Sequence, residues 1–211
     1  LLPYILVNYI KPLPSLVLII LLQVIILSQA IRLNILMSKL KMYQQVSYLP
    51  GFTYIILTAL FPYWDVISSG LVANSLVLWI LVKLLRLYDQ NQPKSLEFNI
   101  GLLLGCSILL YEPIAILIPV VIFALAIIRP FRLTEWLVLI MGIVLPFYFI
   151  FTYVFLTDSA AAFTAFLPKL DWENPFAALD AKSIIALSFM GLQLLIGLYF
   201  WQEQQNRFII Q

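Results

Sequence analysis

Residues 98–132 read FNIGLLLGCSILLYEPIAILIPVVIFALAIIRPFR, two apolar runs that are separated by Glu112-Pro113 and closed by Arg129 and Arg132. Continuous apolar runs of this kind are typical of helices in a lipid bilayer. Proline disfavours helix at the residue before it, so the chain breaks or turns near Glu112. One kinked helix over 98–128 would be much longer than the about 20 residues that cross a membrane. The stretch therefore favours a tight helical hairpin, with Glu112 at its tip and cations at its base.

The rest of the chain has the same character. Of its 211 residues, 64% are hydrophobic and 10% are charged, whereas soluble domains average about 45–50% apolar and roughly 25% charged residues. The runs are continuous rather than alternating, which favours helices over a membrane β-barrel. The chain has no histidine and one cysteine, Cys106, so we expect no disulfide and no metal site. Composition thus predicts an all-α, polytopic transmembrane helical bundle that forms one domain over residues 1–211.

The runs predict about seven spans, several of them short or broken by proline. They cover about 14–37, 47–62, 66–85, 98–111, 113–128, 136–157 and 183–201, and Pro146 interrupts the sixth. Residues 87–97, LYDQNQPKSLE, are predicted to form a solvated loop. Residues 158–182 are predicted to form a longer loop at the outer face. Because residue 1 is leucine, we also expect a further N-terminal part of the protein to precede it.

Cations follow every second predicted span. The expected topology anchors are Lys83, Arg86, Arg129, Arg132 and Arg207. Loops on the cytoplasmic side of a membrane carry an excess of lysine and arginine, so spans one, three, five and seven should end in the cytoplasm. The pattern predicts a multi-pass membrane protein. A net charge of +2, spread along one face, does not indicate a nucleic-acid partner.

Two acids at the predicted outer tips are the candidate catalytic residues. Glu112 lies between two apolar runs, where it could accept a proton, bind a cation or act as a general base. Alternatively, it could begin the fifth span as a capping acid, because the dipole of a helix favours negative charge at its N-terminus. Asp65 stands in the same relation to the third span, and the same two interpretations apply. If both acids faced one outer cavity, they would form a carboxylate pair.

Gly101 and Gly105 are four residues apart on the fourth predicted span, and this spacing lets another helix approach closely. Polar residues inside spans, such as Gln23, Ser28 and Asn74, are expected to form interhelical hydrogen bonds rather than ligand contacts. The sequence has no Walker A loop, no nucleophile elbow and no CxxC pair. Charge in the middle of the spans is almost absent, which disfavours an ion-coupled transporter.

Four phrases carry a family resemblance: YLPGFTYIILTALFP (48–62), FNIGLLLG (98–105), IIRPFRLTEWL (127–137) and LPFYFIFTYVFLTD (145–158). They resemble an uncharacterised family of inner-membrane proteins of Bacteroidota. More distantly, the layout is similar to the membrane part of GT-C type glycosyltransferases, in a short hairpin ending at Pro62, a span, a basic loop and a GLLLG segment. That resemblance implies an isoprenoid-linked sugar as substrate, with Glu112 or Asp65 as base or metal ligand. The chain departs from it because Lys11, Lys169 and Lys182 are the only cations expected outside.

Two functions remain open at this point. The first is a non-catalytic integral membrane protein, a subunit or assembly factor of a cell-envelope complex, whose partners are the lipid bilayer and other membrane proteins. The second is a GT-C-like glycosyltransferase, or a degenerate relative, which uses a polyprenyl-phosphate-linked sugar at the outer face. The sequence leaves open whether the protein is an enzyme and whether it binds a cofactor.

Overall fold

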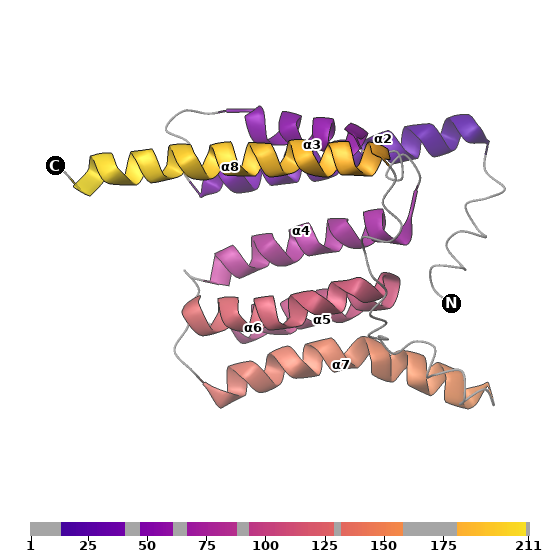
Figure 1. The fold of residues 1–211 in the computed structure, drawn as a ribbon. Helices are drawn as coiled ribbons and strands as arrows, with labels where there is room; N and C mark the ends of the chain where they lie inside the picture. The colour runs from indigo at the N-terminus through magenta and orange to yellow at the C-terminus, as the bar shows by residue number, and fades with distance from the viewer. Residues whose placement is uncertain are drawn as a thin grey trace.

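The computed structural model describes residues 14–40, 47–60, 67–87, 93–128, 132–157 and 181–209. Its helices are α2 (Ser15–Lys39), α3 (Leu49–Leu60), α4 (Ser69–Leu87), α5 (Lys94–Leu110), the 3-10 helix η2 (Glu112–Ile116), α6 (Leu117–Ile128), α7 (Leu133–Leu156) and α8 (Ala181–Ile209). These residues contain no β-strand, so the all-α prediction is confirmed for them. The helix axes run nearly parallel, and consecutive α-helices point in opposite directions (Figure 1).

The number of spans differs from the expectation of about seven. Three described helices, α2, α4 and α7, are long and apolar enough to cross a membrane. α3 has 12 residues and rises about 18 Å, whereas the hydrocarbon core is about 30 Å thick. The segment Glu112–Ile128 and the apolar part of α8, Ile184–Tyr199, are also too short. The three long helices indicate a membrane protein, but the apolar runs overstated how many full-length spans it has.

Two boundaries show how the prolines act. α5 ends at Leu110, and the chain then reverses through η2 into α6, so these residues form a hairpin and not one kinked helix (Figure 1). Pro146 does not interrupt α7, which continues from Leu133 to Leu156 and bends in its second half (Figure 1). A proline inside a helix removes one backbone hydrogen bond and bends the helix without ending it when packing holds both sides.

The predicted loop over residues 87–97 is partly wrong. Leu87 is the last residue of α4 and is fully buried, and residues 94–97 form the first turn of α5. Polar residues suit this turn because the first four N–H groups of a helix lack partners within the helix. This first turn also contains the acid Glu97. Most of the predicted outer loop, 158–180, lies outside the described residues, and α8 already begins at Ala181.

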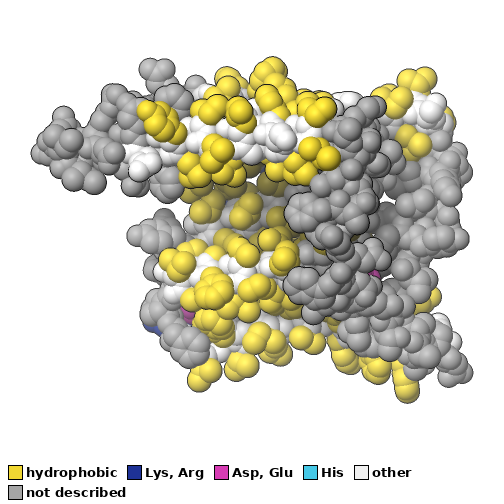
Figure 2. Space-filling model, viewed as in Figure 1, with side chains coloured by type: hydrophobic (Ala, Val, Ile, Leu, Met, Phe, Trp, Pro, Cys, Tyr) yellow, Lys and Arg dark blue, Asp and Glu magenta, His cyan; other side chains and the backbone are white. Residues whose placement is uncertain are grey.

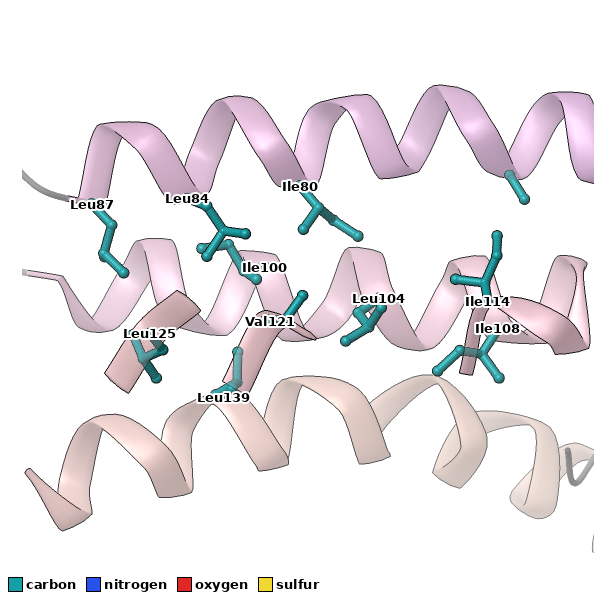
Figure 3. Close-up of a cluster of buried hydrophobic side chains, with 11 residues drawn as sticks. Ile80, Leu84, Leu87, Ile100, Leu104, Ile108, Ile114, Val121, Leu125 and Leu139 are labelled. Atoms are coloured by element: carbon teal, nitrogen blue, oxygen red, sulfur yellow. The ribbon is translucent and has the colours of Figure 1, made fainter. Parts of the chain in front are cut away.

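The main core lies between α4, α5, α6 and α7. α4 contributes one row of side chains and α5 faces it with a second row, while η2 and α6 add side chains from the hairpin and α7 closes the cluster (Figure 3). The labelled members are Ile80, Leu84, Leu87, Ile100, Leu104, Ile108, Ile114, Val121, Leu125 and Leu139. Lipid tails are as apolar as these side chains, so close packing rather than exclusion of water stabilises such a core in a membrane.

Closest packing occurs where α5 crosses α7. A Cβ on Gly101 would overlap the carbonyl oxygen of Leu139, and one on Gly105 would lie 2.5 Å from that of Ile143. Gly142 of α7 makes the matching contact from the other helix, because a Cβ added there would lie 2.5 Å from the carbonyl oxygen of Phe98. Only glycine therefore fits at these positions, and the two helix backbones are in direct contact. The predicted packing glycines lie inside this crossing, with Gly142 as a third member.

A second group of helices lies beside the first. α2 and α3 form a hairpin that packs against α4 through Leu22, Ile26 and Leu71. Gly51 of α3 lies close to the backbone of α2, since its Cβ would be 3.2 Å from the carbonyl oxygen of Ala30. α4 thus belongs to both groups and lies between α2 and α5 (Figure 1).

The outer surface of the described helices is strongly apolar. Hydrophobic side chains cover most of the described surface on the face in Figure 2, and few charged ones are visible there. Most described side chains of α8 are exposed, and Gly191 would have no atom within 4 Å of an added Cβ. A surface of this kind suits a lipid environment, in agreement with the three long apolar helices.

We predict that Gly101→Ala destabilises the protein, because its Cβ cannot fit against the backbone of α7. The expected loss of unfolding free energy is about 1–3 kcal/mol, as for other overpacked sites. Gly191→Ala is the matched control and should be neutral or slightly stabilising, since alanine favours helix and this position is open. Denaturant titration of both variants in detergent micelles measures the difference. Equal stability of the two variants would show that the α5–α7 contact is not this close.

Candidate functional site

Gln29, near the middle of α2, is a buried polar side chain. It is 1% exposed and lies where α2 meets both α3 and α4. Its Nε2 donates one hydrogen bond to the carbonyl oxygen of Leu71, at 2.8 Å, and another to Oγ of Ser75, at 2.6 Å. Both acceptors belong to α4. One amide therefore links the α2–α3 hairpin to the rest of the bundle.

The amide oxygen of Gln29 is also satisfied. Tyr54 of α3 donates its hydroxyl proton to Gln29 Oε1. Asn74 of α4 donates from Nδ2 to Tyr54 Oη at 2.9 Å and, more weakly, to Gln29 Oε1 at 3.4 Å. An amide offers two donor protons and two acceptor positions, and all four are used here. Gln29, Tyr54, Asn74 and Ser75 form one closed network across three helices, which we call the Gln29 network.

A pocket of about 590 Å³ opens on one side of this network. It lies between the end of α3, the start of α4 and the end of α5. The residues that line it are Tyr54, Thr58, Ser68, Ser69, Gly70, Leu71, Asn74 and Tyr111. Five of these side chains carry hydroxyl groups and none carries a charge. Pockets of this size hold small ligands, and this lining suits a neutral group with several hydrogen-bonding atoms. We call it the hydroxyl pocket.

A smaller pocket, of about 200 Å³, lies on the other side of Gln29, between α2 and α4. Its lining residues are Val24, Ile25, Ser28, Gln29, Arg32, Ser75, Leu76 and Trp79. The guanidinium of Arg32 stacks over the ring of Trp79, with its Cζ atom 4.5 Å from the ring centroid. We call this the Arg32 pocket. It differs from the hydroxyl pocket in having a positive charge and an apolar wall.

Of the two predicted catalytic acids, Glu112 is not among the described residues that line either pocket. Glu112 is the first residue of η2 and is exposed, one residue after the pocket-lining Tyr111. Asp65 lies outside the described residues, so the predicted carboxylate pair cannot be located. Among the described residues, no three histidines, cysteines or acids come together as a metal site would require. The described residues that line the two pockets include no acid–base pair that could activate a nucleophile.

The predicted topology anchors fall at one end of the bundle. Lys83 and Arg86 belong to the last turns of α4, and Arg132 directly precedes α7; both of these helix ends lie on the left in Figure 1. Arg129 is outside the described residues, and for Arg207 only its place in α8 is described. We call this end of the bundle the Arg86 end. The hydroxyl pocket lies toward the opposite end, where α4 begins.

Sequence reasoning missed two buried acids at the Arg86 end. Glu97 in the first turn of α5 is fully buried, and Glu135 in the first turn of α7 is 3% exposed. Arg132 lies 3.8 Å from Glu135, one turn away along the chain. Glu97 belongs to the predicted solvated loop, and Glu135 directly precedes the sixth predicted span. Their position just before a long apolar run was the available signal, because acids favour the first turn of a helix.

These helices and contacts define an all-α membrane protein whose central polar groups connect its helices. Residues 4–208 match a protein family of unknown function, DUF6427, so the chain belongs to that family. No curated protein and no solved structure matches the chain. Membership in a family without assigned function agrees with the resemblance that the four sequence phrases indicated.

We predict that Gln29→Leu lowers the free energy of unfolding by about 1–3 kcal/mol, because it breaks the link between α2 and α4 and leaves polar partners unpaired. Asn34→Leu on the same helix is the matched control. Its buried Oδ1 atom has no hydrogen-bond partner in the described part of the chain, so removal of this amide should be neutral or stabilising.

Thermal unfolding of both variants in the same detergent provides the comparison. A loss of stability in the Asn34 variant that equals the loss in the Gln29 variant would contradict the role given to the network.

Proposed function

We propose that this protein is a non-catalytic integral protein of a bacterial inner membrane that serves as a subunit or assembly factor of a cell-envelope complex. One observation carries the proposal: the polar side chains at the centre of the described helices satisfy one another. Gln29 has both donors and both acceptor positions in use. A catalytic site instead keeps its reactive groups available to a substrate. The Gln29 network is built to hold helices together.

The exposed surface of α8 supports the proposal that the protein binds a partner protein. This helix has 29 residues, and apart from Ala186 and Gln193 its described side chains from Ile184 to Tyr199 are exposed. Protein helices in lipid associate through close packing and interhelical hydrogen bonds, and an open glycine allows such packing. Gly191 offers such an open position. In this proposal a transmembrane helix of the partner packs against α8.

Orientation follows from the cations in this proposal. Lys83, Arg86 and Arg132 place the Arg86 end in the cytoplasm, by the excess of lysine and arginine on that side of membranes. Consecutive α-helices point in opposite directions (Figure 1). We propose that the shorter ones also cross the membrane, so that α2 to α8 make seven crossings. In this proposal the bilayer thins locally around α3, which is about 12 Å shorter than the hydrocarbon core. The hydroxyl pocket then faces the outer side.

The alternative is a GT-C-like glycosyltransferase or a degenerate relative. One observation favours it: the hydroxyl pocket lies next to Glu112 and its neutral hydroxyl-rich lining suits a sugar. The same lining counts against it, because a polyprenyl phosphate needs a cation, and none lines this pocket in the part of the chain that the structure describes. In this alternative Glu112 or Asp65 acts as the base or metal ligand.

We predict that native mass spectrometry of the full-length protein, extracted gently from its own membrane, detects a stoichiometric protein partner. The double variant Glu112→Gln and Asp65→Asn should retain this partner in full, because neither acid contributes to the helix contacts that hold a subunit. The same preparation is analysed for bound lipid. A retained isoprenoid glycolipid on protein that is otherwise alone would contradict the subunit function and favour the enzyme.

A further inference from the structure

Arg32 is a charged residue in an apolar part of the bundle. It lies seven residues before the end of α2, about 10 Å along the helix axis from Lys39, and it is partly buried. An arginine within the hydrocarbon region is unfavourable unless it reaches the interface or an opposite charge. Its charge is therefore stabilised either by reaching the interface or by an anion in the Arg32 pocket.

The helices around Arg32 do not provide a negative charge. α2, α3 and α4 contain no aspartate and no glutamate within their bounds. The buried acids Glu97 and Glu135 belong to α5 and α7 at the far side of α4, and Glu135 lies beside Arg132. Among the side chains that the structure describes, no ion pair joins Arg32 to a carboxylate within 4 Å. The contact that the structure gives it is the ring of Trp79.

The cation–π contact places Cζ of Arg32 over the ring of Trp79 and gives the guanidinium no oxygen acceptor. A guanidinium has five N–H donors along the edge of its plane. The edge remains available for a planar, bidentate contact with an oxyanion, and phosphate is a preferred partner of arginine in this geometry. Ser28 and Ser75 line the same pocket and can donate hydroxyl protons to the same anion.

Size and polarity of the pocket suit the head of a lipid. Its volume of about 200 Å³ is several times the roughly 30 Å³ that one water occupies in the liquid, so a tetrahedral phosphate fits. Val24 and Ile25 precede Arg32 by about two turns, and Leu76 precedes Trp79 on α4, which runs in the same direction (Figure 1). The apolar wall thus lies toward the middle of the bundle and the charge lies toward the Arg86 end. This is the order of acyl chain and head group in one leaflet.

We propose that the Arg32 pocket binds the phosphate of an anionic phospholipid, with Arg32 as the ligand of the phosphate oxygens. Ser28 and Ser75 donate further hydrogen bonds, Trp79 holds the guanidinium flat, and the first part of the acyl chain lies against Val24, Ile25 and Leu76. The site is separate from the hydroxyl pocket and does not depend on the proposed function. It assigns to this protein a specific lipid of the leaflet at the Arg86 end.

The test uses the full chain in nanodiscs and in detergent, with phosphatidylglycerol as the anionic probe and phosphatidylcholine as the neutral one. Retained lipid is counted by native mass spectrometry and its affinity is measured by competition with a spin-labelled lipid. For the wild-type protein, phosphatidylglycerol should bind more tightly than phosphatidylcholine. Arg32→Gln should weaken phosphatidylglycerol binding about tenfold, as expected for the loss of a charge-assisted contact.

Two further variants keep the result interpretable. Lys39→Gln removes an exposed cation from the last turn of the same helix and should leave the affinity unchanged. Arg32→Lys keeps the charge but not the flat fork, so it should retain folding while it loses part of the affinity. If the Lys39 and Arg32 variants lose the same amount of phosphatidylglycerol affinity, the effect comes from general surface charge. This result would overturn the proposal.

Inorganic phosphate tests whether the anion in the pocket is a lipid head group or a free phosphate ion. It should not compete with the lipid at millimolar concentration, because it lacks the acyl chain that contacts Val24, Ile25 and Leu76. Binding of free phosphate to the wild-type protein, abolished by Arg32→Gln, would overturn the lipid assignment in favour of a soluble anion. Unchanged phosphatidylglycerol affinity in a folded Arg32→Gln variant would overturn the site itself.

Discussion

Direct backbone contact between α5 and α7 is the constraint on which the rest of the bundle depends. In lipid, burying an apolar side chain against another gives little advantage over burying it in acyl chains, so helices associate where their surfaces fit most closely. Gly101, Gly105 and Gly142 remove every side chain from that crossing. α5 then presents its opposite face to α4 and to the α6 hairpin, and the main core of the protein forms there. The remaining helices are arranged around this fixed pair.

The sequence predicted the class, the order and the alternating direction of these helices, but not their lengths. Several helices extend beyond the expected spans at their polar ends: α5 begins at Lys94, α7 begins at Leu133, and α8 continues to Ile209. Polar residues can complete the first and last turns of a helix, so an apolar run does not fix where the helix begins or ends. The described part of α3, Leu49–Leu60, has 12 residues, fewer than the about 20 that cross a membrane. The spacing of Gly101 and Gly105 pointed to a close helix contact. It could not identify Gly142, because a single glycine in an apolar run does not stand out as a contact residue.

The candidate site was less predictable, for a physical reason. Sequence reasoning favoured carboxylates at the tips of hairpins, since charge near hydrocarbon is rare and noticeable. The centre of the described bundle instead uses neutral amides and hydroxyls, whose value depends on which groups they meet. Tyr54 and Asn74 are 25 and 45 residues from Gln29, and no local spacing links them. Only the packing of three helices brings them together, so this network could not be read from the sequence.

The same network has a consequence for the synthesis of the protein. Gln29 enters the membrane with α2, but the groups that accept its two amide protons, on Leu71 and Ser75, follow 42 and 46 residues later. At about 5–20 residues per second, the ribosome needs roughly 2–9 s to supply them. During that time a bare amide in lipid would lack partners for its hydrogen bonds. Helix α2 therefore acquires its final hydrogen bonds only after α4 has been synthesised, so the assembly of these two helices follows the order of the chain.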